Sequence, residues 1–175
     1  MVKIIWYATL FLVIALKDFI ILTDTRQQKE NHIIKEFDKN SILHIRTTLE
    51  SADYVAVRGN ENGFFIDYSI LIDTKKDLEE LSSNLCSKDH ERVKREIERA
   101  RELGCQDFYF IIANNKIKTI DDLRQWRSKR TRVTGEILCK VMKTMVERYK
   151  IKFIITKKNE VGKKIINIFK SKGEK

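Results

Sequence analysis

One short segment limits the fold more than any other part of this sequence. Residues 108–113 read Phe-Tyr-Phe-Ile-Ile-Ala, a run that favours a strand and offers almost no polar face. Such a strand is stable when both of its faces are buried, as in the centre of a sheet with helices on each side. The surrounding pattern agrees, because predicted strands come first and then alternate with amphipathic helices. The sequence therefore predicts an α/β fold with a mixed central β-sheet flanked by helices.

Hydrophobic periodicity divides the chain into short elements, with a glycine-rich turn at residues 59–63. Strands are predicted at residues 18–23, 42–48, 54–58, 64–68, 69–73, 108–113 and 151–156. Helices are predicted at residues 27–37, 76–85, 89–103, 119–126, 132–149 and 161–169. The helix over residues 132–149 is expected to bury an i, i+4 stripe formed by Val133, Ile137, Val141, Met145 and Tyr149.

The chain reads as one domain over residues 18–170, because proline is absent and only six glycines occur. An apolar segment, residues 1–17, precedes the domain, and a short basic tail, residues 171–175, follows it. Residues 4–16 form an uninterrupted uncharged run of 13 residues, fewer than the roughly 20 that a membrane span needs. Two interpretations stay open: a short membrane-associating helix, or an extension packed on or lying outside the domain. Three scattered cysteines are typical of reduced thiols in a cytoplasmic protein.

Charge is distributed unevenly along the chain. Residues 116–175 carry 19 basic and 6 acidic side chains, whereas residues 1–115 have a net charge of −3. A net charge of +10 favours a polyanionic partner such as nucleic acid. The residues predicted to contact phosphate lie at three places: Arg26 after the first strand, Arg92 and Arg95 on a helix, and Arg124, Arg127, Lys129, Arg130 and Arg132 around a core tryptophan. For Arg92 and Arg95, the sequence favours the alternative of a solvated helix face with i, i+4 ion pairs.

Acidic residues stand at the ends of several predicted strands. Asp24 follows the first strand, Asp53 precedes the third, and Asp73 ends an apolar run with Lys75 two positions on. Glu79 lies one helical turn later and is a possible accessory acid. Carboxylates gathered at neighbouring strand ends repel each other unless a cation is present, and their oxygens suit Mg²⁺. The pattern predicts metal-assisted phosphodiester hydrolysis, with Lys75 positioning or helping to deprotonate the attacking water. The alternative is that each aspartate is an ordinary turn or N-cap residue.

Three short motifs resemble the nuclease domain of XPF-type structure-specific endonucleases, a branch of the PD-(D/E)xK superfamily with a restriction-endonuclease-like fold. They are Asp24-Thr25-Arg26-Gln27, Ala52-Asp53-Tyr54, and Asp73-Thr74-Lys75 followed by Glu79. The likeness is closer to the small single-domain members of bacteria and phages, which share His-x-Arg and Arg-Glu-Ile-x-Arg-Ala. Here these read Asp89-His90-Glu91-Arg92 and Arg95-Glu96-Ile97-Glu98-Arg99-Ala100.

The resemblance implies a Mg²⁺- or Mn²⁺-dependent DNA endonuclease, active at branched or junction structures, in repair or recombination. It implies Asp24, Asp53, Asp73 and Lys75 as catalytic residues, with the three aspartates as metal ligands. Three positions depart from the family pattern: Gln27 replaces Glu, Ala52 replaces Gly, and Asp73 replaces Glu. The helix-hairpin-helix module of larger relatives has no counterpart in the sequence. Substrate recognition would then depend on the basic tail, on homodimerisation or on a partner protein.

Two other functions stay open at this point. The chain could be a nucleic-acid-binding module that kept the fold after its active site changed, because Gln27 removes one acid. It could also be a membrane-associated form of the nuclease, if residues 1–17 act as an anchor.

Overall fold

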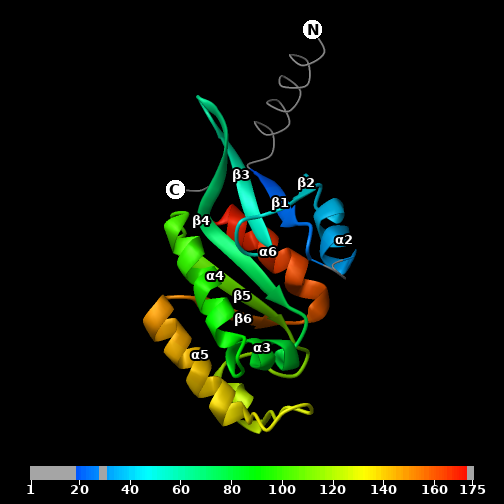
Figure 1. Cartoon of the computed structure of the whole chain (residues 1–175). Helices are drawn as coiled ribbons and strands as arrows, with labels where there is room; N and C mark the ends of the chain where they lie inside the picture. Colours follow the sequence, from blue (N-terminus) through cyan, green and yellow to red (C-terminus); the bar gives the residue numbers. More distant parts are fainter. Residues whose placement is uncertain (1–18, 28–30, 173–175) are drawn as a thin grey trace.

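The computed structural model describes residues 19–27 and 31–172 (Figure 1). The strands are β1 (Ile20–Asp24), β2 (His44–Thr47), β3 (Tyr54–Asn60), β4 (Gly63–Lys75), β5 (Asp107–Ala113) and β6 (Lys152–Thr156). They form one sheet in the order β2-β1-β3-β4-β5-β6. Strand β3 runs antiparallel to both of its neighbours, whereas the β1–β2, β4–β5 and β5–β6 pairs are parallel. The predicted mixed sheet is therefore confirmed.

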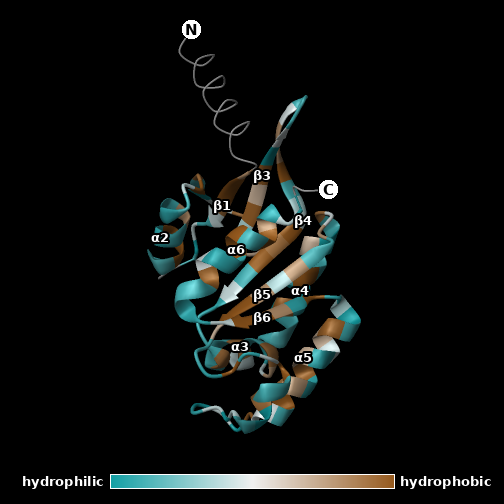
Figure 2. Ribbon diagram, turned by 180° about the vertical axis from the view of Figure 1, so that it is seen from behind, coloured by the Kyte–Doolittle hydropathy of each residue, from teal (hydrophilic) through white to brown (hydrophobic). Residues whose placement is uncertain are grey.

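Helices cover both faces of the sheet (Figures 1 and 2). They are α2 (Asn31–Lys39), α3 (Leu78–Leu85), α4 (His90–Glu102), α5 (Gly135–Tyr149) and α6 (Val161–Lys170), with 3₁₀ turns η1 (Asp121–Gln125) and η2 (Lys158–Glu160). One hydrophobic core joins the sheet to α3, α4 and α5, and the other joins it to α2 and α6. Phe110 of β5 enters the first core and Ile111 the second, and neither is exposed. The central strand is thus buried on both faces, as its sequence predicts.

Several predicted features lie outside the described residues. These are the apolar segment at residues 1–17, residue 18 of the first predicted strand, residues 28–30 of the first predicted helix, and residues 173–175 of the tail. Among the helices that the structure describes, none combines the length and hydropathy needed to cross a membrane.

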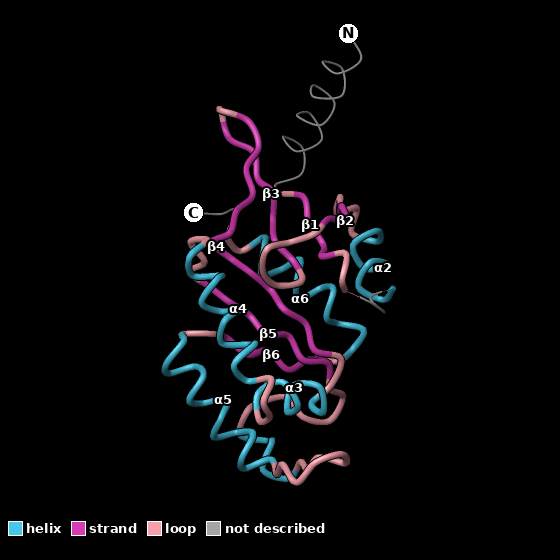
Figure 3. The backbone as a smooth tube through the Cα atoms, viewed as in Figure 1, coloured by secondary structure: helices cyan, strands magenta, loops and turns pink. Residues whose placement is uncertain are grey.

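Strand β4 is a single long strand, not the two that its sequence predicts. Its first part forms a hairpin with β3 that projects from the body (Figure 3), and its second part pairs with β5. A register shift between Val55 and Ala56 leaves residues 68–70 outside the β3 ladder, close to the predicted break. Gly63 closes the tight turn with φ +121°, a backbone conformation that side-chain-bearing residues rarely adopt.

Arg58 ties the base of this hairpin to the rest of the molecule. Its Nε donates to Asp67 Oδ2 at 2.8 Å, and its Nη2 donates to the carbonyl oxygen of Phe169, at the end of α6. The guanidinium also lies 5.6 Å from the centre of the Phe19 ring. Burial raises the pKa of Asp67, but hydrogen bonds from Ser69 and Arg58 outweigh it and hold that pKa below 3.8.

We expect Asp67→Asn to lower stability at neutral pH by about 2 kcal/mol, because Arg58 loses its charged acceptor. A depressed folded-state pKa stabilises the protein above the unfolded-state value, near 3.8, and this contribution is lost as the pH falls through the folded-state value. Urea unfolding between pH 7 and pH 2.5 should therefore show a gap between wild type and variant that closes as the pH falls. A gap of constant size across that range would contradict the assignment.

The buried face of helix α5 overlaps the predicted i, i+4 stripe but is shifted from it. Its buried side chains include Leu138, Met142 and Met145, whereas Ile137 of the predicted stripe is 47% exposed. The helix begins at Gly135 and not at residue 132, because Thr134 accepts a hydrogen bond from the amide of Ile137 and acts as the N-cap. The predicted stripe is therefore confirmed for Met145 and, as partly buried residues packed against the core, for residues 133, 141 and 149, and it is wrong for Ile137.

The predicted capping box at residues 119–122 is confirmed. The amide of Asp122 donates to Thr119 Oγ1, and the amide of Thr119 donates to Asp122 Oδ2. The turn that follows is the 3₁₀ turn η1 and not an α-helix, and Trp126 at its end packs partly buried against the core.

Candidate functional site

Asp53 and Asp73 face each other across the ends of two antiparallel strands. Tyr54 of β3 pairs with Ile72 of β4, so the next position in the register sets Asp53 opposite Asp73. The amide of Asp53 donates to the carbonyl oxygen of Ile72 at 3.0 Å, which fixes this register. Asp53 Oδ2 accepts hydrogen bonds from the amide and the hydroxyl of Thr74, at 2.7 and 2.8 Å. The strand ends thus bring together two of the predicted carboxylates.

Lys75 completes this arrangement from the same strand. Its Nζ lies 2.7 Å from each carboxylate oxygen of Asp73, and both residues are buried. The ammonium also lies 5.4 Å from the centre of the Phe110 ring. Burial lowers the pKa of Lys75, but the charges of Asp73 and Asp53 outweigh burial and raise it above 10.5. Lys75 is therefore a fixed positive charge inside the protein.

The cluster has more negative than positive charge when both carboxyls are ionised. Burial, and next the negative charge of Asp73, raise the pKa of Asp53 well above its ordinary value. One lysine cannot neutralise two carboxylates that share a space of low polarity. The site therefore attracts either a proton or a further cation.

Gln27 contacts the cluster from the residue position where the family pattern has Glu. Its Nε2 donates to Asp53 Oδ2 at 2.5 Å and to Thr74 Oγ1 at 2.9 Å. An amide can stabilise the aspartate in this way without adding negative charge. Gln27 therefore stabilises the Asp53 carboxylate, whereas the negative charge of a glutamate at this position would repel it.

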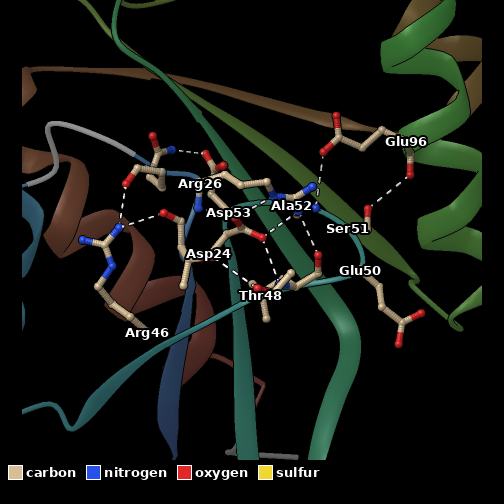
Figure 4. Close-up of polar contacts among 12 residues, drawn as sticks. Asp24, Arg26, Arg46, Thr48, Glu50, Ser51, Ala52, Asp53 and Glu96 are labelled. Atoms are coloured by element: carbon tan, nitrogen blue, oxygen red, sulfur yellow. Dashed lines mark hydrogen bonds and ion pairs between the residues drawn. The ribbon is translucent and has the colours of Figure 1, made fainter.

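Glu96 is an acidic residue of the site that was not among the predicted site residues. It lies on α4, where Oε1 accepts from the amide of Ala52 at 3.3 Å and its carbonyl oxygen accepts from the Ser51 hydroxyl (Figure 4). Burial, and then the charge of Asp73, raise the pKa of Glu96. A signal existed in the sequence, since Glu96 belongs to the Arg-Glu-Ile-x-Arg-Ala motif and directly precedes buried Ile97.

Asp24 is buried near the cluster, but its carboxylate is held by other groups (Figure 4). Arg26 donates from Nε to Oδ1 at 2.8 Å and from Nη2 to Oδ2 at 2.6 Å, and the amide of Leu49 donates to Oδ2 at 2.9 Å. Burial raises the pKa of Asp24, but the bonds from Arg26 and Leu49 outweigh burial and lower it. Arg26 keeps 65% of its side chain exposed and can still meet a phosphate.

Glu79 does not join the other acids in this structure. Its Oε2 accepts from the hydroxyl of Ser128, and its Oε1 accepts from the amide of Lys129, both at 2.7 Å. The bond from the Lys129 amide, opposed by slight burial, keeps the pKa of Glu79 below its ordinary value. We therefore assign Glu79 to positioning the exposed loop over residues 127–133, and the predicted four-acid cluster is corrected to Asp53 and Asp73 with Glu96 nearby.

The basic residues predicted to contact phosphate are mostly exposed. Arg95 projects from α4, and Arg92 lies 4.0 Å from Glu96, which fits the predicted i, i+4 ion pair. The basic segment, residues 124–132, consists of the end of η1 and the loop after it. The backbones of Arg127 and Thr134 pair as an isolated antiparallel β-bridge at the base of this loop. The exposed members of this segment are Arg124, Arg127, Lys129, Arg130 and Arg132.

Ala52 has a strained backbone at the residue position where the family pattern has Gly. Its φ is +62°, in the left-handed region that costs a residue with a β-carbon about 1 kcal/mol. We expect Ala52→Gly to raise the free energy of unfolding by up to that amount. Ala100→Gly in α4 is the control, because it removes an equally buried methyl from ordinary helical backbone and should destabilise. Equal destabilisation of the two variants in urea unfolding would show that strain at Ala52 is unimportant.

The donor set of the cluster fits a divalent metal ion. Within the described ranges, no three acidic, histidine or cysteine side chains converge as a ready-made metal site. Two carboxylates are nevertheless sufficient for Mg²⁺, which takes one or two carboxylates and completes its shell with water and substrate phosphate oxygens. Asp53 and Asp73 supply such oxygens, and the raised pKa of Asp53 shows the charge imbalance that a cation would relieve.

Comparison with known proteins agrees with this fold. A family model described as the ERCC4 domain matches residues 23–168, which is most of the chain. No curated protein matches the sequence. Among solved structures, XPF from Aeropyrum pernix is similar at 14% identity and a TM-score of 0.62, over 86% of this chain and 65% of that chain.

A second structure of XPF from Aeropyrum pernix, in complex with DNA, is similar at 15% identity with a TM-score of 0.59. It covers 85% of this chain and 62% of that chain. The chain thus spans just under two thirds of the length of either XPF chain. The XPF-type architecture predicted from the motifs is confirmed, and the chain belongs to the ERCC4 domain family.

Proposed function

We propose that this protein is a divalent-metal-dependent endonuclease that hydrolyses phosphodiester bonds in branched or junction DNA. The observation that carries the proposal is the arrangement of half-buried Asp53 with buried Asp73 and Lys75 at the strand ends of an XPF-type nuclease fold. Lys75 is buried against Asp73 and is influenced by the charge of Asp53, and burying such an ion pair is weak evidence for a purely stabilising role. The DNA in the complex of the similar XPF structure supports DNA as the substrate class.

The chemistry follows from where the charges lie. Asp53 and Asp73 would hold Mg²⁺ or Mn²⁺, which when bound polarises the phosphate and lowers the pKa of a water molecule. The protonated ammonium of Lys75 is placed to offset the negative charge that builds on the phosphate in the transition state. Lys75 is therefore better suited to positioning water and substrate than to accepting a proton. Gln27 holds Asp53 in place through its amide.

DNA binding is assigned to exposed cations around this cluster. Arg26 leaves the first strand beside the site, and the basic segment, residues 124–132, is held near the end of β4 by Glu79 at the start of α3. Contacts of this kind bind phosphate irrespective of sequence and weaken as salt increases. The distribution of charge therefore favours recognition of DNA shape over DNA sequence.

The proposal is tested by cleavage of labelled single-stranded, duplex, flap and four-way junction DNA with Mg²⁺ or Mn²⁺. We expect metal-dependent cutting that EDTA abolishes, with junction and flap substrates cut faster than plain duplex. Binding without cutting, on every substrate and with either metal, would instead identify an inactive DNA-binding module. Cell fractionation of the full chain, with and without residues 1–17, tests cytoplasmic against membrane-associated localisation.

A further inference from the structure

A cavity beside the carboxylate cluster takes no part in the mechanism above. Its volume is about 380 Å³, and its walls include Thr74 and Lys75 from the end of β4 together with Gln27. Gln27 and Thr74 donate to Asp53 Oδ2, so the cavity reaches the carboxylate cluster at the strand ends, whereas the side chains of Asp73 and Lys75 lie on the opposite face of the sheet, toward Phe110. Its other wall comes from α2 and α6, on the face of the sheet away from the basic segment.

The cavity combines an apolar floor with a cationic rim. Ile33, Ala113 and Val161 line the floor and are almost completely buried. Two of the cations at the rim already form ion pairs: Arg26 with Asp24, and Lys75 with Asp73. The side chains of Lys76 and Lys158 are exposed and add positive charge beyond those two ion pairs. The remaining polar lining residues are His32 and Glu80.

We propose that this cavity binds one unpaired nucleotide of the DNA strand that is cut, next to the scissile phosphate. The base would pack on Ile33 and Val161, and its phosphate would meet Lys158 and Lys76. The inference rests on the proposed function, because it assumes that a DNA strand passes the carboxylate cluster. A volume of about 380 Å³ is at the lower end of small-molecule pockets, so it accommodates one nucleotide and not a base pair.

The chemistry of the rim matches this ligand. A lysine ammonium is a compact charge that binds phosphate from several directions, so two of them can follow a flexible strand. Burial, and then the charge of Lys158, lower the pKa of His32, so its imidazole is neutral at pH 7 and can hydrogen-bond to a base edge. Glu80 is turned toward the backbone, where it accepts from the amide of Lys76 at 2.9 Å.

The direct test is a methyl NMR titration of the full chain, without metal, using thymidine 5′-monophosphate. We expect the methyl signals of Ile33 and Val161 to shift, whereas Ile97, in the core on the opposite face of the sheet, stays unchanged. Inorganic phosphate at the same concentration should leave the Ile33 and Val161 methyls in place, because it has no base. Unmoved Ile33 and Val161 methyls in the presence of the nucleotide would overturn the proposal.

A pair of lysine variants localises the phosphate. Lys158→Ala should weaken nucleotide binding about tenfold, as expected for the loss of one charge-assisted contact. Lys164→Ala removes an equally exposed lysine from α6 outside the cavity and should leave binding unchanged. Equal effects of the two variants would show that the nucleotide binds to the general positive field and not in this cavity.

A further titration, with an oligonucleotide, distinguishes binding of a nucleotide within a DNA strand from binding of a free nucleotide. Single-stranded (dT)₄ should shift the same methyls, and a blunt duplex long enough to stay fully paired should not. Shifts with the monophosphate but none with (dT)₄ would contradict binding of a strand nucleotide. Because no metal or cleavage is needed, failure of the nuclease proposal and failure of this one are distinguishable: binding without cutting rejects only the first, and cutting without methyl shifts rejects only the second.

Discussion

Replacing Asp73 with asparagine should reduce cleavage about a thousandfold or more while leaving DNA affinity nearly unchanged. The loss is large because the site gives up one of two carboxylates, and several kcal/mol of charge stabilisation in the transition state depend on that carboxylate. Affinity is retained because the cations assigned to phosphate contact are exposed and lie outside the buried cluster. Folding should survive, since Lys75 keeps Asp53 as a neighbouring negative charge.

Single-turnover cleavage and fluorescence anisotropy measure the two quantities separately. Asp107→Asn is the matched control, because Asp107 begins the adjacent strand β5, at the other end from the site, and is bound to Lys152 at 2.9 Å. That variant should cut at close to the wild-type rate. Undiminished cutting by Asp73→Asn, at full binding, would remove the cluster from the mechanism.

Replacing Gly135 with alanine should lower stability by about 3 kcal/mol, at the upper end of overpacking effects. A β-carbon at this position would lie 1.6 Å from the carbonyl oxygen of Leu123 and 2.8 Å from that of Trp126. Both contacts are with backbone, which cannot rotate away as a side chain can. The amide of Gly135 also donates to the Trp126 carbonyl at 2.7 Å, so α5 and η1 would have to separate.

The same variant should weaken DNA binding, because the basic segment, residues 124–132, runs from η1 to the start of α5. We expect a fall in melting temperature of about 10 °C for a chain of this size, measured by circular dichroism. Lys140→Ala, at an exposed position on the same helix, should change the melting temperature little. A Gly135→Ala protein that melts within about 1 °C of wild type would show that the two backbones are not in tight contact.

The strand pattern and the catalytic core could be predicted from the sequence because both depend on local periodicity. Residues 108–113 have no polar face, so a central position in the sheet follows directly. Asp73 and Lys75 share a strand and are two residues apart, which places them on one face in any sheet. Asp53 could be added because polar residues at neighbouring strand ends meet at one edge of the sheet.

Other features depended on contacts between segments that are distant in the sequence. Helix α5 has apolar residues on more than one side, so its sequence does not define a single buried face. In the structure, Gly135 packs tightly against the backbone of η1, and Leu138 and Met142 are buried while Ile137 stays exposed. The position of Asp24 at the end of a strand does not predict that it pairs with Arg26 and Leu49, because a carboxylate at a strand end can bind either a metal ion or a guanidinium group.

The sequence by itself determined the order of strands and helices, the two-faced burial of β5, and the presence of Asp53, Asp73 and Lys75 at one sheet edge. These features can be read from the sequence because side chains repeat every two residues in a strand and every 3.6 residues in a helix, so a few neighbouring positions define each face. Only the tertiary structure decided that Glu96 joins the site, that Glu79 holds the basic segment, and that α2 and α6 enclose a cavity beside the carboxylates. The physical reason is that burial, charge coupling and cavity shape are set jointly by elements that meet only when the chain is folded.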